Sequence, residues 1–201
     1  MHIESEEQLR EIYGHPKGRA KNKQLSALER HSTHFIEHSP FVAISTHATS
    51  GLVDCSPRGG KPGFVKILSE SCIILPDGKG NNRLDSLVNI IETGDIGCLF
   101  LIPGVDETLR VNGRARISTS IEHLGLFSND RNPAKTCIEI TIKEVFLHCA
   151  KALMRSELWS SKSKIDRSEL PTMGAMINDQ FSVNDAPESQ EDMVARYVHD
   201  L

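Results

Sequence analysis

Short runs of apolar and β-branched residues follow one another from Phe41 to Cys149, and they constrain the fold more than any other feature of this chain. Polar turns separate most of these runs, and one helical pattern, Leu84–Glu92, interrupts them. Helices do not alternate regularly with strands, as a doubly wound parallel sheet would require. About six or seven strands joined by short turns favour a small closed β-barrel with helices beside it.

The expected strands differ in how deeply they are buried. Ile96–Ile102 is a nearly continuous apolar run, which is typical of a strand that is covered on both faces. Thr108–Thr119 instead alternates, so that Arg110, Arg114 and Arg116 are predicted to share one polar face. The other strands are expected at Phe41–Thr46, Leu52–Cys55, Phe64–Leu68, Cys72–Leu75, Cys137–Ile142 and Val145–His148.

Helices are expected at both ends of the chain. Ser5 is in the position of an N-cap, and the helix that follows it should end at Gly14. A basic linker, residues 17–23, leads to a second helix that begins with Leu25 among its apolar positions and stops near His38. The 201 residues fit a single domain. Within it we expect N-terminal helices over residues 1–40, the barrel core over 41–150 and a C-terminal helical arm over 151–201.

The overall charge of the chain excludes several classes of function. The net charge is −4 and the isoelectric point is about 6.1, so no general basic excess favours nucleic acid or an anionic membrane surface. No apolar run approaches the roughly 18–20 residues that span a bilayer. The first residues are acidic and lack the pattern of a signal peptide. A cytoplasmic location is therefore expected.

The five cysteines and nine histidines do not form a recognisable metal or disulfide pattern. The number of cysteines is odd and no C-x-x-C pair is present, so we expect free thiols that mostly act as small buried hydrophobic groups. Cys55 differs because it borders a polar segment. His31, His34 and His38 are spaced to share a helix face, but no cysteine or carboxylate completes a tetrahedral set. No metal site is predicted.

Two basic segments that contain glycine indicate a phosphate site. Residues 54–65 carry Ser56, Arg58 and Lys61. Residues 76–87 carry Lys79, Asn81, Asn82 and Arg83 just before the expected helix, and Ser86 in its first turn. Arginine, lysine, hydroxyl groups and a helix N-terminus are the groups that bind a phosphate monoester. The alternative is a pair of surface loops with scattered charges, and spacing alone does not decide between them.

A third cluster combines a basic helix face with the only tryptophan. Lys151 and Arg155 are four residues apart and share a face, and Trp159 lies about one turn further along. A basic face that ends in an indole suits a ring system, on which it could stack. An indole that covers the core beside the aliphatic part of an arginine explains the same pattern equally well.

Four segments in a fixed order resemble the flavoproteins related to pyridoxamine 5′-phosphate oxidase, the FMN-binding split-barrel family. They are DCSPRGGKPGFV (54–65), LPDGKGNNRLDSL (75–87), FLIPGVDETLRVNGRA (100–115) and KALMRSELW (151–159). The resemblance implies a mainly β fold with flanking helices, a six-stranded split β-barrel of the FMN-binding type. It also implies a homodimer with FMN in a cleft at the subunit interface and a small-molecule substrate.

The resemblance assigns roles by position. Ser56, Pro57, Arg58 and Gly59 would lie along the ribityl chain and ring of FMN, with Arg58 and the backbone N–H groups of Gly59 and Gly60 near the reduced ring. Asn82, Arg83 and Ser86 would hold the phosphate. Lys151, Arg155 and Trp159 would close the site, from the second subunit in one version of this hypothesis.

The function that the resemblance implies is an FMN-dependent oxidoreductase whose substrate is unknown, with no catalytic residue assigned. The oxidases of vitamin B6 have a paired Arg-Lys before the helix, where this chain has Asn82-Arg83, so vitamin B6 itself is not expected to be the substrate. Two alternatives stay open. One is a deazaflavin-dependent reductase on the same fold, and the other is a non-catalytic carrier or sensor that binds flavin or haem.

Overall fold

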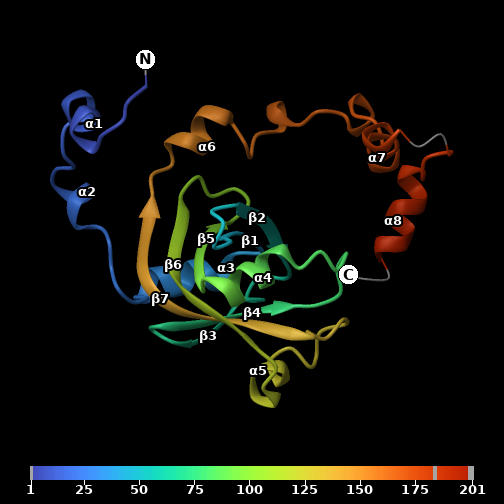
Figure 1. Ribbon diagram of the computed structural model, residues 1–201, viewed down its shortest axis with the longest axis horizontal. Coiled ribbons are helices and arrows are strands. Elements are labelled where there is room, and N and C mark those ends of the chain that lie inside the picture. The colour runs from blue at the N-terminus through green and yellow to red at the C-terminus, as the bar shows by residue number, and fades with distance from the viewer. Residues whose placement is uncertain (1, 183–184, 199–201) are drawn as a thin grey trace.

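A single antiparallel sheet of seven strands forms the centre of the molecule (Figure 1). This computed structural model describes residues 2–182 and 185–198. The strands are β1 (Phe41–His47), β2 (Val53–Gly59), β3 (Lys66–Ser69), β4 (Cys72–Asp77), β5 (Asp95–Leu101), β6 (Thr108–Ser118) and β7 (Thr136–His148). Their order in the sheet is β2-β1-β5-β6-β7-β4-β3, so β2 and β3 form its two edges.

The mainly β fold with flanking helices is confirmed. The sheet has seven strands, within the six or seven that the sequence pattern predicted, whereas the family resemblance implied six. Strand β3, expected at Phe64–Leu68, is short. The chain reverses after β3, and β3 then pairs with β4 from Lys66 opposite Ile74 to Ser69 opposite Cys72. The two segments expected at the end of the barrel are instead one long strand, β7.

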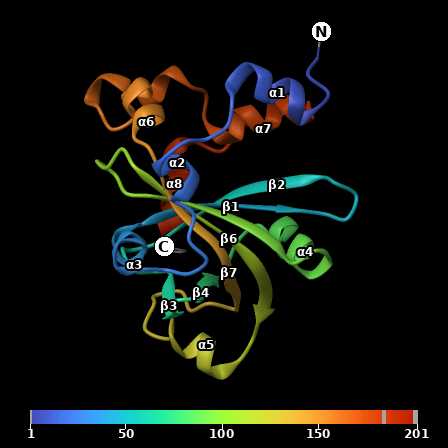
Figure 2. The same ribbon diagram turned by 90° about the vertical axis from the view of Figure 1, so that its left-hand side faces the viewer.

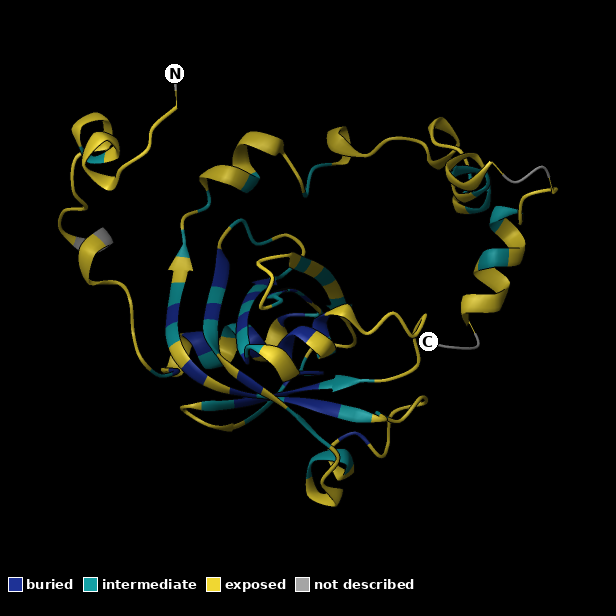
Figure 3. Ribbon diagram, in the orientation of Figure 1, coloured by how far each residue is buried: buried dark blue, intermediate teal, exposed yellow. Residues whose placement is uncertain are grey.

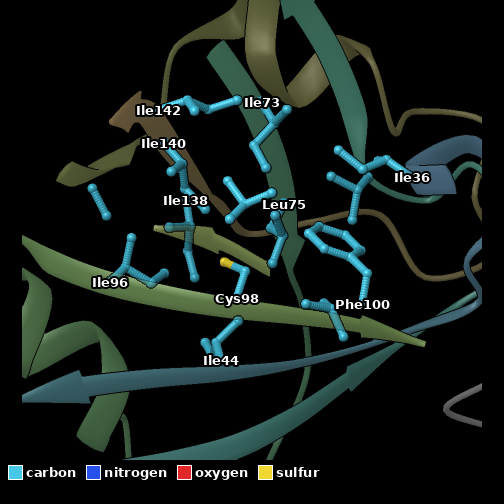
Figure 4. Packing of buried hydrophobic residues seen from close by; sticks show 14 of the residues in the cluster. Ile36, Ile44, Ile73, Leu75, Ile96, Cys98, Phe100, Ile138, Ile140 and Ile142 are labelled. Carbon is cyan, nitrogen blue, oxygen red and sulfur yellow. The ribbon is translucent and has the colours of Figure 1, made fainter. Parts of the chain in front are cut away.

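The sheet curls so that strands far apart in its order face each other across one core (Figure 4). Leu75 of β4 lies close to Cys98 and Phe100 of β5, although β6 and β7 separate their strands in the sheet. All three side chains are buried. Alternation explains which residues point inward, because β1 and β5 bury every second residue. The burial of apolar surface around this core stabilises the curled sheet.

A β-bulge at Lys143 lets β7 act as one strand. Asn112 of β6 lies opposite Glu144, but the next residue, Gly113, lies opposite Ile142, so Lys143 is the extra residue. The bulge shifts the alternation of β7 by one position. This shift explains why the sequence pattern is interrupted here although the pairing continues.

Strand β2 extends further than the sequence indicated. Leu52–Cys55 was expected as a strand that ends in a polar loop, but β2 continues to Gly59 and pairs with β1 along its whole length. Pro57 is opposite Ala43 in this pairing. Proline has no N–H group and is tolerated here because β2 is an edge strand, whose other side needs no hydrogen bonds. The expected loop residues Ser56 and Arg58 therefore lie on a strand.

Most helices lie at the periphery of the sheet, and the terminal ones are largely exposed (Figure 3). The helix between β4 and β5, α4, was predicted from its apolar spacing and is present. Helix α3 closes one end of the core with Ile36, which is fully buried, and begins with a capping box between Glu29 and Ser32. The helices are α1 (Glu6–Tyr13), α2 (Arg19–Asn22), α3 (Arg30–His38), α4 (Asp85–Glu92), α5 (Ile121–Gly125), α6 (Lys151–Ser156), α7 (Met173–Phe181) and α8 (Gln190–Val198).

Helices α1, α6 and α7 lie away from the sheet (Figure 2). Helix α1 is confirmed, with Ser5 as its N-cap and Gly14 as its C-cap. The second expected helix begins later than predicted, because Leu25 forms a backbone bridge with Val145 of β7 in extended conformation. Within the part of the chain that the structure describes, no helix has the length and apolar character needed to cross a membrane.

The cysteines divide by position. Cys98 and Cys137 are buried as expected, and burial raises the pKa of the Cys98 thiol to about 12. Cys55 is exposed at the edge strand. The expectation of burial is wrong for Cys149, which is exposed because the chain leaves the sheet directly after His148.

Gly113 is expected to be essential for the bulge. A Cβ atom at this position would lie 2.2 Å from the carbonyl oxygen of Thr141, so Gly113→Ala must displace the backbone of β7. We expect Gly113→Ala to lower the free energy of unfolding by about 1–3 kcal/mol in urea denaturation. Gly125→Ala is the matched control, because nothing lies within 4 Å of the added atom. An equal stability of both variants would contradict this role of Gly113.

Candidate functional site

Seven of the ten predicted site residues line one cleft. This cleft, which we call the loop cleft, has a volume of about 1210 Å³ and lies between β2, the loop before α4, the start of α4 and the loop after α5. The predicted residues that line it are Ser56, Pro57, Arg58, Gly59, Asn82, Arg83 and Ser86. The two basic segments of the sequence therefore meet in space.

A carboxylate at the base of the loop cleft connects β2 to α4. Asp54 accepts hydrogen bonds from the hydroxyl groups of Ser56, at 3.3 Å, and of Ser86, and the two hydroxyl oxygens are 2.8 Å apart. Ser86 is buried on the face of α4 that packs against the sheet. On the same face Asn89 donates to the hydroxyl oxygen of Thr46 in β1, at 3.0 Å. These buried polar contacts fix the position of α4, because moving the helix would leave them unpaired.

The loop before α4 has an unusual backbone. Asn82 and Leu84 have φ angles of 60° and 61°, in the left-handed region. Such a conformation costs roughly 1–3 kcal/mol for each residue other than glycine, and it is found most often at functional sites. Leu84 is the N-cap of α4 and provides no side-chain hydrogen bond to the helix. The amino end of α4 therefore opens into the loop cleft without a side-chain cap, which suits an anion.

The lining of the loop cleft is positively charged in a protein that is acidic overall. It contains six cationic side chains and four carboxylates. Two of the arginines are paired inside the cleft, Arg58 with Asp77 at 3.5 Å and Arg83 with Asp85 at 2.8 Å. The hydrogen bond that Arg83 donates to Asp85 also raises the pKa of Arg83 above its usual range, so Arg83 stays charged.

The loop after α5, which sequence reasoning did not assign to the site, supplies part of this charge. Its residues Asn129, Asp130, Arg131 and Asn132 line the cleft. No ion pair or hydrogen bond of the Arg131 side chain is found within the described chain. The only sequence signal of this loop is its run of polar turn residues. Such a run is typical of any surface loop, so it does not identify a binding site.

One expected contribution to the cleft is wrong. The backbone N–H of Gly60 was expected to be available near a bound ring, but it donates to the carbonyl oxygen of Pro40 at 3.0 Å. The extended pairing of β2 with β1 brings these two residues together. Arg58 and Lys61 are the cationic residues of this segment that line the cleft.

The third predicted cluster lies elsewhere. Lys151 and Arg155 line a second cleft of about 1500 Å³, the sheet cleft, on the outer face of β1, β5 and β6. Helix α6 ends at Ser156, so Trp159 is not one turn further along the same helix as expected. Its ring Nε1 donates to the carbonyl oxygen of Val105, at 2.9 Å, in the loop between β5 and β6. Within one chain, these three residues do not face the loop cleft.

Charged groups on β1, β5 and β6 pair within the sheet cleft. Asp95 accepts from Arg114 and lies 3.2 Å from the Nε2 atom of His47, and Arg114 above all lowers the pKa of Asp95. A hydrogen bond to the Ala48 carbonyl and then the contact with Asp95 raise the pKa of His47. Two of the arginines on the predicted polar face thus pair with carboxylates, since Arg110 also contacts Glu144 at 2.7 Å.

No group of three His, Cys, Asp or Glu side chains within residues 2–182 and 185–198 could hold a metal ion. Of the three histidines considered above, His34 and His38 instead stack on each other, with ring centroids 4.1 Å apart.

Comparison with known proteins matches the central part of the chain to one family. The family model described as pyridoxamine 5′-phosphate oxidase matches residues 28–149, more than half of the chain. No curated protein matches the sequence.

One solved structure has a similar fold at low sequence identity, and another is similar over a comparable part of the chain. HupZ from Group A Streptococcus is 14% identical and has a TM-score of 0.51, covering 60% of this chain and 93% of that chain. An FMN-binding protein from Syntrophomonas wolfei subsp. wolfei is 14% identical with a TM-score of 0.43, covering 58% of this chain and 88% of that chain. The likeness to HupZ concerns the fold.

The ion pair of His47 should make stability depend on pH. The folded-state pKa of His47 is raised, so its contribution is present below about pH 6.5 and disappears as the pH rises through the folded-state pKa. Asp95 stays ionised over this range, while Arg114 opposes the charge on His47. We expect His47→Gln to lower the thermal midpoint more at pH 5.5 than at pH 8, values that lie about 1 unit below and about 1.5 units above the ordinary pKa of histidine. His15→Gln, which replaces an exposed histidine, is the control. If His47→Gln lowers the thermal midpoint by the same amount at both pH values, relative to this control, the ion pair of His47 makes no such contribution.

Proposed function

This chain belongs to the pyridoxamine 5′-phosphate oxidase family, and from this premise we propose that it is an FMN-dependent oxidoreductase that binds FMN in the loop cleft. The observation that carries the proposal is the meeting of two basic segments, separated in the sequence, around one positively charged cleft. Their residues are those on which the family resemblance rests. Scattered surface charges would not be expected to converge in this way.

The chemistry of the loop cleft fits the phosphate of FMN. Arg83 supplies a charged, planar donor and Asn82 supplies an amide. Ser86 was also expected to hold the phosphate, but it is buried and its hydroxyl group donates to Asp54, so it fixes the start of α4 instead. The amino end of α4, which has no side-chain cap, adds a favourable dipole. The pairing of Arg83 with Asp85 is exposed and therefore weak, so a doubly charged phosphate would compete with it.

The remaining part of the cleft fits a larger group than a phosphate. Its volume of about 1210 Å³ is ample for a cofactor-sized ligand. Ser56, Pro57 and Gly59 would lie along the sugar chain and ring. Arg58 would stabilise negative charge on the reduced ring, and its pairing with Asp77 holds the guanidinium at the wall of the cleft. A bound flavin supplies the hydride or electron transfer, which explains why no acid–base pair is needed from the protein.

A homodimer would bring the remaining three residues to the site. Lys151 and Arg155 face the sheet cleft of their own chain, while Trp159 lies beside the loop at Val105. We propose that the outer face of β1, β5 and β6 packs against a second subunit, so that the α6 residues of one subunit close the loop cleft of the other. The apolar residues of the sheet cleft, such as Leu99 and Leu153, suit such an interface.

An absorption spectrum of the purified protein, with the released chromophore identified by mass, tests this function. Flavin absorption with FMN released supports the proposal, and oxidation of NAD(P)H by the bound flavin would support catalysis. A deazaflavin would keep the oxidoreductase on the same fold but replace the cofactor. A Soret band would indicate a haem carrier. A colourless protein that gains no thermal stability from added FMN would contradict flavin binding.

Arg83→Ala is expected to weaken FMN binding by about 2–3 kcal/mol, because a charge-assisted hydrogen bond to phosphate is lost. Fluorescence titration of the apoprotein with FMN measures this change. Arg116→Ala is the matched control, since Arg116 is exposed and lies outside both clefts. Equal affinity of Arg83→Ala and the control would remove Arg83 from the phosphate site.

Complementation between subunits tests the shared site. Arg83→Ala and Arg155→Ala should each weaken FMN in their own homodimers. Mixed dimers of the two variants should regain one tight site, because one cleft then has both wild-type arginines. The stoichiometry of tight FMN sites after mixing and refolding measures this recovery. Mixed dimers without a tight site would show that both arginines act within one subunit, as would a monomer that retains FMN.

A further inference from the structure

Three polar residues of β2 form a row along one wall of the loop cleft. Asp54, Ser56 and Arg58 are each two residues apart, and all three line this cleft. Residues two apart on a strand share a face. Val53 and Cys55, on the other face, line the sheet cleft instead. An acid, a hydroxyl group and a base therefore lie side by side on the face of β2 that a ligand in the loop cleft would meet.

A chain of hydrogen bonds connects the two charged ends of this row. The Nη1 atom of Arg58 donates to the hydroxyl oxygen of Ser56 at 3.0 Å. That oxygen lies 2.8 Å from the hydroxyl oxygen of Ser86, and the hydroxyl group of Ser86 donates to Asp54. Ser56 also lies 3.3 Å from the same carboxylate oxygen. Arg58 and Asp54 are thus linked through two hydroxyl groups, one on β2 and one on α4.

The chemistry of the two ends sets the direction of every hydrogen bond in the chain. An arginine side chain only donates hydrogen bonds, and an ionised carboxylate only accepts them. The hydroxyl proton of Ser86 is directed at Asp54, so the proton of Ser56 is directed at one of these two residues and away from the guanidinium. The oxygen of Ser56 therefore presents a lone pair to Arg58. Hydrogen bonds that run in one direction polarise one another, so each is stronger than it would be alone.

This chain fixes one side of the Arg58 guanidinium. Nη1 also donates to the backbone carbonyl oxygen of Pro57 at 2.9 Å, and Nε lies 3.5 Å from Asp77. Contacts at two different nitrogen atoms define the orientation of a planar group, whereas the contact at Nε alone would let it tilt. Within the described chain, no hydrogen bond of the Nη2 atom is found, so this atom remains for a ligand in the loop cleft.

We propose that Asp54 is a positioning residue of the loop cleft, which orients the Arg58 guanidinium toward a bound flavin ring through Ser86 and Ser56. This inference rests on the proposed binding of FMN in the loop cleft. Asp54 does not touch the ligand in this role and acts on the ring only through Arg58. The same carboxylate holds the start of α4, so it ties the orientation of Arg58 to the helix whose amino end faces the phosphate.

The positioning role and a simple charge effect predict opposite changes in the flavin. A carboxylate near the ring disfavours additional negative charge there, so removing the charge of Asp54 would raise the midpoint potential through space. If Asp54 instead orients Arg58, removing it takes a favourable cation away from the reduced ring, and the midpoint potential falls. The sign of the shift therefore distinguishes positioning from proximity.

The hydrogen-bond chain is tested first in the apoprotein, by urea unfolding. Asp54→Asn removes the charge but keeps the shape of the side chain, and Ser56→Ala breaks the chain while Ser86 stays bonded to Asp54. Asp54→Asn and Arg58→Ala should each lower the free energy of unfolding, and the double variant should lose less than the sum, because both changes break one chain. In the Ser56→Ala background the losses should be additive. Additive losses with Ser56 present would overturn the proposal.

The midpoint potential of bound FMN, measured by equilibration with a reference dye, is the second test. Asp54→Asn and Ser56→Ala should each reduce the preference of the protein for reduced over oxidised flavin by about tenfold, which lowers the potential of a two-electron couple by about 30 mV. In the Arg58→Ala background neither substitution should lower the potential further. Ser71→Ala is the matched control, because Ser71 is exposed and lies outside both clefts.

The outcomes separate this role of Asp54 from the proposed function. A potential that rises or stays unchanged in Asp54→Asn would overturn the proposal, as would a decrease that persists without Arg58. Titration of the wild-type apoprotein with FMN is the reference. Tight binding of FMN with unchanged potentials would contradict only the role of Asp54. A wild-type protein that binds no FMN would contradict the proposed function, and the role of Asp54 at the ring with it.

Discussion

The pairing of β6 with β7 is the contact on which the rest of this structure depends. It joins β2, β1 and β5 on one side of the sheet to β4 and β3 on the other. Without it, β4 and β5 would not face each other across the core. The bulge at Lys143 belongs to this pairing, and Gly113 permits it because no side chain fits beside the Thr141 carbonyl. Beyond the bulge, Glu144 lies on the outer face, where it contacts Arg110.

The loop cleft follows from this arrangement. The curled sheet leaves β2 as an edge strand, and α4 packs beside it through a polar contact centred on Asp54. An apolar contact would tolerate sliding of the helix, whereas hydrogen bonds between fixed groups do not. The left-handed residues Asn82 and Leu84 directly precede this fixed helix. A rigid backbone with an open helix end is a suitable frame for an anionic group.

The charged residues predicted for one site lie on two separate surfaces, the two clefts. The loop cleft has its own arginines, while Lys151 and Arg155 lie on the outer face of the sheet. The terminal helices carry exposed apolar side chains. The position of Lys151 and Arg155 is explained if the chain works as a pair of subunits. In that arrangement, the α6 residues of each subunit would close the loop cleft of the other.

The sequence by itself determined most of the strand pattern, helix α4, the Ser5 cap and seven residues of the loop cleft, because these depend on local periodicity and residue chemistry. The sequence did not show that Ser56–Gly59 belong to a strand. Proline and glycine are typical of a turn, and it is the pairing with β1 that makes this segment extended. The sequence also could not show that Lys151 and Arg155 lie outside the loop cleft of their own chain. That separation depends on the order of strands in the sheet, which arises from contacts between residues far apart in the chain.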